Sequence, residues 1–121
     1  MILETLTQTF TVCKPLTAND IDMVIPFCFA ARTDGELSLV CPTEFVPSQT
    51  VAREDGWRAF RVSGSMAFSL VGILARITGT LAQRDIPVFA ISTFDTDYVL
   101  VKADRFSAAM DALAAAGYDL H

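Results

Sequence analysis

The chain has 121 residues, of which 52% are hydrophobic and 19% charged; nine basic and fourteen acidic side chains give a formal net charge of −5. This length allows one ordinary domain or two very small ones, and the apolar fraction is too high for intrinsic disorder. No run of Lys or Arg supplies the positive surface of a nucleic-acid binder or an anionic-membrane binder, so both classes of partner are excluded.

The apolar stretches at the N-terminus and in the middle of the chain lack the features of targeting or membrane-spanning segments. Residues 1–12 have no basic leader and alternate polar with apolar side chains, so we expect a strand and no signal peptide. Residues 66–81 contain polar side chains, among them Ser69 and Arg76, that are costly in lipid. A membrane span is therefore not expected.

Three cysteines are present, and their pattern favours thiols over disulfides. Cys13, Cys28 and Cys41 are an odd number, stand far apart in sequence and lie in apolar, strand-like runs without C-x-x-C spacing. Buried free thiols in a cytosolic protein are the main interpretation, and a disulfide or redox role is the alternative.

The first half of the chain predicts short β elements around one hairpin. Asp34-Gly35 is a strong turn signal between two β-prone runs, and the polar stretch that follows contains Pro42, Pro47 and Gly56. We therefore expect a strand over residues 5–14, a helix of one or two turns over 17–24, a hairpin of strands 27–32 and 36–41, and a boundary over 42–56.

The second half changes its hydrophobic period within one continuous stretch, residues 72–101. Apolar residues from Leu70 to Leu81 recur at helical spacing, and from Ile86 onward they follow the spacing of strands. The expected elements are a strand over 57–62, a helix with Ser69 as candidate N-cap, a hairpin of strands 86–94 and 98–103, a helix over 105–116 that is capped by Asp104 and stopped by Gly117, and a short strand over 118–120.

This order of elements, β, α, β, β, α, β, is the split βαβ or ferredoxin-like plan, an α+β sandwich with helices on one face of an antiparallel sheet. The first half offers a strand, a short helix and a hairpin, which is a reduced version of the same plan. We therefore predict a tandem duplication, with a reduced N-terminal unit over residues 1–55 and a complete unit over 56–121.

Three motifs of the second unit resemble the ACT domain, the small regulatory module of amino-acid metabolism. They are WRAFRVSG, VGILARI and AISTFDTDYVLV, and they are similar to tandem ACT proteins related to aspartokinase regulatory regions and to the cytosolic arginine sensors of animals. The resemblance covers residues 57–120, and in the first half it is limited to the hairpin at 27–41. It implies a regulatory protein that binds a free amino acid, often between two ACT units.

Carried onto matching positions, the resemblance implies a ligand site at the helix start and on the second hairpin. Backbone N–H groups near Gly72 suit a carboxylate, and a side chain there would obstruct its approach. Carboxylates on the hairpin suit an ammonium group. Ser69 and Leu70 stand where arginine-binding relatives carry acidic residues, so specificity for arginine is not implied. The candidate ligand-binding residues are Ser69, Gly72, Ile73, Thr93, Phe94, Asp95 and Asp97.

These residues also have a purely structural interpretation. Gly72 can serve close packing of the helix, and Thr93 and Phe94 can be ordinary strand residues. Asp95 and Asp97 can belong to a solvated turn, and they lack the Gly and the distal Glu of a calcium loop, so we predict no metal site.

No motif requires catalysis. His121 is the single histidine and the last residue, which leaves Cys–His and Ser–His–Asp chemistry without a positioned base. The segment Gly64-Ser65-Met66-Ala67 is neither a nucleophile elbow nor a phosphate loop. A small enzyme that uses Asp97 or a loop serine is the minor alternative.

The sequence thus predicts a non-enzymatic, cytoplasmic protein of two ACT-like units that binds an amino acid and uses no cofactor. Exposed edges of small sheets and the high apolar fraction predict that it associates as a homodimer. The alternative function is a protein–protein interaction module with a vestigial ligand site.

Overall fold

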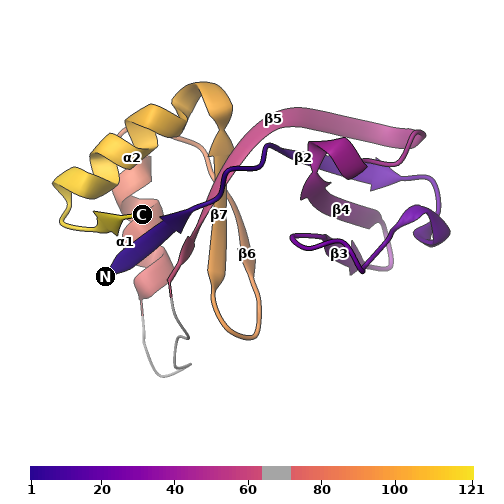
Figure 1. Cartoon of the computed structure of the whole chain (residues 1–121), viewed down its shortest axis with the longest axis horizontal. Helices are drawn as coiled ribbons and strands as arrows, with labels where there is room; N and C mark the ends of the chain where they lie inside the picture. Colours follow the sequence, from indigo (N-terminus) through magenta and orange to yellow (C-terminus); the bar gives the residue numbers. More distant parts are fainter. Residues whose placement is uncertain (64–71) are drawn as a thin grey trace. The chain divides into compact units, whose positions relative to one another are not determined.

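The computed structural model describes residues 1–63 and 72–121 (Figure 1). The candidate cap Ser69, with Leu70 and the predicted loop over 64–69, lies outside the described residues. By its contacts the chain divides into unit 1, which consists of Met1–Thr7 and Arg58–His121, and unit 2, which consists of Gln8–Trp57.

Unit 1 is a sheet with α1 (Ile73–Ala82) and α2 (Phe106–Ala115) packed on one face. Its strands lie in the order β8, β1, β5, β7, β6. Neighbouring strands are antiparallel where β1 meets β5 and where β6 meets β7, and parallel where β1 meets β8. The order along the chain from β5 confirms the ferredoxin-like α+β plan. The strands are β1 (Ile2–Thr5), β5 (Thr50–Val62), β6 (Phe89–Ser92), β7 (Asp97–Lys102) and β8 (Asp119–Leu120).

The strand predicted over residues 5–14 is wrong in its bounds, because two strands form instead. β1 pairs with the end of β5, with Leu3 opposite Val62, and inserts between β5 and β8. β2 (Phe10–Pro15) pairs with the earlier part of β5. Leu3 is fully buried, and burial of this apolar side chain stabilises the position of β1 in the sheet of unit 1.

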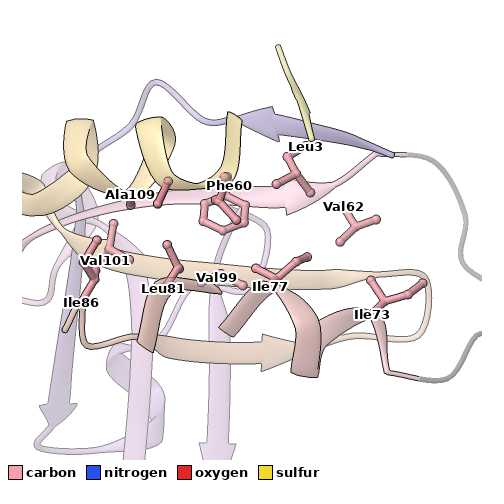
Figure 2. Packing of buried hydrophobic residues seen from close by; sticks show 12 residues of the cluster. Leu3, Phe60, Val62, Ile73, Ile77, Leu81, Ile86, Val99, Val101 and Ala109 are labelled. Atoms are coloured by element: carbon pink, nitrogen blue, oxygen red, sulfur yellow. The ribbon is translucent and has the colours of Figure 1, made fainter. Parts of the chain in front are cut away.

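The core of unit 1 follows from two side-chain periods. Alternate residues of β5 and β7, including Phe60, Val62 and Val99, point to the helix-covered face. Ile77 and Leu81 of α1 meet them at helical spacing, and all five are at most 3% exposed (Figure 2). Each such side chain contributes roughly 1.5–3 kcal/mol on burial, so the cluster holds α1 firmly on the sheet.

Both helices end with a residue in the left-handed conformation. Gly117 has φ 99°, and Tyr118 N donates to Leu113 O at 3.1 Å after α2, which confirms the predicted glycine stop. After α1 the equivalent residue is Asp85, with φ 56°, and Ile86 N donates to Leu81 O at 3.1 Å. These bonds satisfy carbonyl groups that the helices leave open.

Unit 2 is a smaller sheet with strand order β3, β4, β2, β5. The helix predicted over residues 17–24 is a single 3₁₀ turn, Ala18–Asp20, in which the Thr17 and Asp20 side chains form a capping box. The turn ends because Ile21 is already extended, with φ −95° and ψ 125°. The remaining elements of this unit are β3 (Phe29–Arg32), β4 (Leu37–Pro42) and the 3₁₀ turn Thr43–Phe45.

The predicted boundary over residues 42–56 is not a loop throughout, because β5 already begins at Thr50. Its polar residues form a strand that pairs with β2 on one side. Between the pairs Phe10–Trp57 and Val12–Glu54 the register shifts, so that Asp55 and Gly56 together oppose Thr11. Gly56 has φ 84°, which fits a β-bulge and explains a glycine inside a strand.

The two units contain equivalent hairpins, separated by 60 positions. β3, β4 and the following 3₁₀ turn begin at residues 29, 37 and 43, and β6, β7 and their 3₁₀ turn begin at 89, 97 and 103. The registers also match, because Phe29 pairs with Val40 and Phe89 pairs with Leu100. This agreement favours the proposed duplication, in which unit 2 retains the hairpin and not the α-helices.

Neither described α-helix has the length and apolar character that crossing a bilayer requires.

Candidate functional site

The turn between β6 and β7 is a compact hydrogen-bonded structure. Thr93 N donates to Thr96 O at 2.8 Å, and the Thr93 hydroxyl donates to the same carbonyl at 3.1 Å. The hydroxyl of Thr96, which is 7% exposed, donates to Val62 O at 2.7 Å. The turn is therefore fastened to the end of β5.

Asp97 follows this turn and is buried, with 8% of its surface exposed. It has the same strand parity as Val99, so its side chain lies on the helix-covered face of the sheet. Ser92 is its cross-strand partner, and the Ser92 hydroxyl donates to Asp97 Oδ1 at 2.5 Å. In the described part of the chain Asp97 has no basic partner. A carboxylate in this position suits a cationic group of a ligand.

The start of α1 combines an unusual backbone conformation with N–H groups that lack a hydrogen-bond partner among the described residues. Gly72 is the N-cap residue, with φ 81° and ψ 7°, and no described side chain caps this end. The first helical bond runs from Arg76 N to Gly72 O at 2.9 Å. The N–H groups of the first turn thus have no partner within the helix, and such groups suit an anion.

Ile73 can contribute to a site only through its backbone. Its side chain is 5% exposed and belongs to the core cluster. Figure 2 shows Ile73 at the end of this cluster where Val62 and the β6–β7 turn also lie, and Figure 1 places the start of α1 and this turn at the same end of unit 1. The fold thus brings the predicted helix start and hairpin to one end of unit 1.

The predicted residues at the tip of the hairpin lie in a different environment from Asp97. Thr93 and Asp95 are exposed, and Phe94 is 81% exposed. The two predicted carboxylates are therefore not equivalent, because one is buried and the other faces solvent. Sequence reasoning missed Ser92 and Thr96, because the predicted strands 86–94 and 98–103 left Asp97 in the turn, whereas the observed register pairs Ser92 with Asp97.

A network of charged and aromatic side chains occupies the other face of the sheet. Arg61 donates to Glu4 Oε1 at 2.8 Å through Nε and to the Tyr98 hydroxyl at 3.1 Å through Nη1. The hydrogen bond to Tyr98, with the nearby Glu4 carboxylate, raises the pKa of Arg61. Strand alternation separates this network from Asp97, so it does not neutralise that carboxylate directly.

Other features of the described residues add no second candidate site. They contain no group of three His, Cys, Asp or Glu side chains arranged to hold a metal ion. A pocket of about 90 Å³ in unit 2 is lined by Gln8, Thr9, Pro42, Thr43 and Glu44. It holds none of the predicted site residues and a single charged side chain.

Similarity to known proteins extends over most of the chain. The rat protein named cytosolic arginine sensor for mTORC1 subunit 1 is 35% identical over 96 residues, which cover 74% of this chain and 29% of the sensor. The human protein of the same name is 33% identical over the same coverage. This chain thus spans less than a third of the length of these curated relatives.

Solved structures share its fold. A structural-genomics crystal structure from Agrobacterium tumefaciens matches with a TM-score of 0.85 and 30% identity, covering 99% of this chain and 91% of that one. The ligand-free regulatory subunit of aspartate kinase from Thermus thermophilus matches with a TM-score of 0.65 and 8% identity, covering 95% and 96%. The family model of the ACT domain matches residues 52–115. The chain therefore belongs to the ACT domain family.

Proposed function

We propose that this chain is a non-enzymatic regulatory protein that binds a free amino acid at the end of unit 1 where α1 begins. The candidate site consists of Gly72 and Ile73 at the helix start and Thr93, Phe94, Asp95 and Asp97 on the hairpin, with Ser69 as a further candidate. The proposed location is the cytoplasm, in keeping with the cytosolic relatives and the free thiols.

The observation that carries this proposal is the environment of Asp97. The side chain is 8% exposed, yet the Ser92 hydroxyl is its hydrogen-bond partner and no basic group neutralises it in the described residues. Removing a carboxylate from water is costly unless it is paired. An ammonium group of a ligand would supply the missing positive charge.

The start of α1 supplies a complementary group for the other charge of an amino acid. Open N–H groups of a helix N-terminus, with the helix dipole, favour a carboxylate. In the proposed complex the ligand carboxylate meets the first turn of α1 and the ammonium group meets Asp97. The relatives support the ligand class, because the curated ones are named as sensors of an amino acid.

The hairpin of unit 2 supports assigning the site to unit 1. Leu37 occupies the position equivalent to Asp97, 60 residues earlier, and it is 9% exposed. A leucine cannot pair with an ammonium group. In the proposed protein, duplication therefore leaves one hairpin able to bind a charged ligand.

Self-association is part of the proposal. Among the described strands β6 pairs with β7 alone, so it is an edge strand of unit 1 that a second copy can extend. A homodimer formed there would place two candidate sites at its interface. A ligand that binds the dimer better than the separate copies would then shift the equilibrium toward the dimer.

Isothermal titration calorimetry of the purified chain against the twenty amino acids tests the ligand class. We expect at least one saturable binding isotherm, and loss of binding for the N-acetyl derivative of that amino acid, which lacks the ammonium charge. Absence of heat and of a thermal shift with every amino acid would refute the proposal. Sedimentation velocity with and without the ligand then measures the expected change in association.

A protein–protein interaction module is the second candidate, and the position of Phe94 favours it. A side chain of this size that is 81% exposed at a hairpin tip is a suitable anchor for a protein partner. Purification from the native cells distinguishes the two functions. A stoichiometric protein partner that is lost with Phe94→Ser, together with no bound metabolite, would favour the interaction module.

A further inference from the structure

The three cysteines, distant in sequence, converge on one face of the unit 2 sheet. Cys13 and Cys41 are 4% and 2% exposed and pack together with Leu39, and the half-buried Cys28 packs against the same cluster. All three are free thiols. This cluster has no part in the proposed ligand site.

Extending the β3–β4 register by one residue, past the last pair of the ladder, sets Cys28 opposite Cys41. Phe29 of β3 pairs with Val40 of β4, so the next pair along the two chains is Cys28 with Cys41. At the turn, Thr33 N donates a hydrogen bond to Glu36 O, so Thr33 and Glu36 are a hydrogen-bonded residue pair. Along an antiparallel hairpin, hydrogen-bonded residue pairs alternate with pairs that share no hydrogen bond. The cysteine pair falls at a non-bonded position, where Cα atoms lie about 4.5 Å apart. Disulfides span Cα separations of about 4.4–6.8 Å.

Cys13 is a diagonal neighbour of this pair. It lies opposite Leu39 in the β2–β4 register, whereas Cys41 lies opposite Thr11. Diagonal neighbours are about 7–8 Å apart, farther than direct partners. The geometry therefore favours bonding of Cys41 to Cys28 over bonding to Cys13.

Cys28 is also the thiol that a small reagent reaches first. It is half-buried, whereas the other two thiols are buried, and its Sγ donates a hydrogen bond to Met23 Sδ at 3.7 Å. Met23 is 61% exposed, so this contact lies near the surface. Burial raises the pKa of Cys28, which makes reaction slow at neutral pH and faster as the pH rises.

We propose that Cys28 and Cys41 are an oxidation-sensitive pair that forms an intrachain disulfide with a small-molecule disulfide as the oxidant. The Cys28 thiol loses its proton, and its sulfur attacks the oxidant, which forms a mixed disulfide and releases one small thiolate. The Cys41 thiolate then attacks the Cys28 sulfur and displaces the second small thiolate. Two protein thiols are oxidised to one disulfide, and one small disulfide is reduced to two thiols.

The structural consequence is a covalent bond between the residue that directly precedes the edge strand β3 and the inner strand β4. β3 pairs with β4 alone among the described strands, so one side of it has no strand partner there. Unit 2 comprises residues 8–57, all described, and has no α-helix to cover its sheet. A bond at this position reduces local opening of a small unit, and reduction restores it.

Oxidation of the folded 121-residue chain with glutathione disulfide at mildly alkaline pH tests the pair. Peptide mapping by mass spectrometry is expected to find a Cys28–Cys41 linked peptide, with the loss of two hydrogens and with Cys13 still alkylatable. Cys13→Ser is the matched control and retains the crosslink. Cys28→Ser and Cys41→Ser are expected to lose it.

A second readout does not depend on how the variants fold. In the oxidised wild-type chain, hydrogen exchange of the β3 amides is expected to slow several-fold and to recover after treatment with dithiothreitol. A disulfide that maps to Cys13, a crosslink that persists in Cys28→Ser, or formation only in denaturant would overturn the assignment. Full oxidant treatment that leaves three free thiols or glutathione adducts alone would also overturn it.

Discussion

The Ser92 hydroxyl donates a 2.5 Å hydrogen bond to the Asp97 carboxylate across the first pair of the β6–β7 hairpin. The equivalent pair in unit 2 is Arg32 with Leu37, in which no carboxylate is present. Two hairpins of the same length and register thus differ at the position that faces the helix side of unit 1.

Replacing Asp97 by Asn is expected to weaken amino-acid binding by roughly tenfold to a hundredfold. The substitution removes the charge, and a hydrogen bond to a charged group contributes about 1.5–3 kcal/mol, where about 1.4 kcal/mol is tenfold in affinity. The Asn oxygen still accepts from Ser92, so the fold is retained. Calorimetry with the amino acid that binds the wild-type chain measures the change.

Asp95→Asn is the matched control for this substitution, because Asp95 is exposed on the same turn. It removes one charge from an exposed member of the candidate site and is therefore expected to weaken the affinity by less than about threefold, since exposed charges are well screened. Equal losses in both variants would mean that general electrostatic attraction, and not the buried carboxylate, determines binding.

Gly72→Ala is expected to destabilise unit 1 by about 1–2 kcal/mol, which is the cost of a left-handed conformation for a residue with a Cβ atom. Gly72 has φ 81°, and an added Cβ would lie 3.1 Å from Arg76 Nη1, an atom that can move away. Chemical denaturation measures the change.

Gly79→Ala in the same helix is the control. It is expected to stabilise by about 0.5–1 kcal/mol, because alanine is favoured over glycine inside a helix and nothing is found within 4 Å of the added Cβ. Destabilisation by both would point to a packing effect along α1.

Gaining a glycine at the end of α1 and losing one at the end of α2 are expected to change the stability in opposite directions. Asp85→Gly is expected to stabilise the protein by up to about 1 kcal/mol, because Asp85 holds φ 56° at the end of α1. Gly117→Ala is expected to destabilise by about 1 kcal/mol, because φ is 99° at the end of α2. Thermal melts of both variants against wild type test the pair. A loss of stability in Asp85→Gly would show that its side chain contributes more than the backbone strain costs.

Alkaline pH is expected to destabilise unit 2 through Cys41. Burial raises the pKa of this thiol to about 12 from 9.0, with smaller contributions from Cys13 and Cys28. Between these values the unfolded chain releases a proton that the folded chain keeps, so the stability is complete below pH 9 and falls as the pH rises. The loss is up to about 1.4 kcal/mol per pH unit.

Urea unfolding from neutral pH to about pH 10 measures this alkaline loss. Cys41→Val keeps an apolar side chain of similar size and removes the titrating group, so its stability is expected to fall less steeply with pH. Identical slopes for wild type and Cys41→Val would assign the alkaline loss to other groups.

Local patterns in the sequence determined the ferredoxin-like plan of unit 1. Two sequence patterns are confirmed in the structure, because each of them buries one continuous apolar face. They are the helical spacing of Ile73, Ile77 and Leu81 and the alternation of buried residues along β7. The role of Gly117 was also predictable from the local sequence, because the end of a helix depends on the backbone conformation of the residue that follows it. The Asp34-Gly35 hairpin likewise follows from turn chemistry.

Only the tertiary structure decided which distant segments meet. The N-terminal strand Ile2–Thr5 joins the sheet between β5 and β8, and three cysteines far apart in sequence share one cluster. The sequence placed Asp95 and Asp97 together on a hairpin, but long-range packing against the helix-covered face buries Asp97 and leaves Asp95 in solvent. Burial depends on what covers a residue, and residues distant in the chain supply that cover.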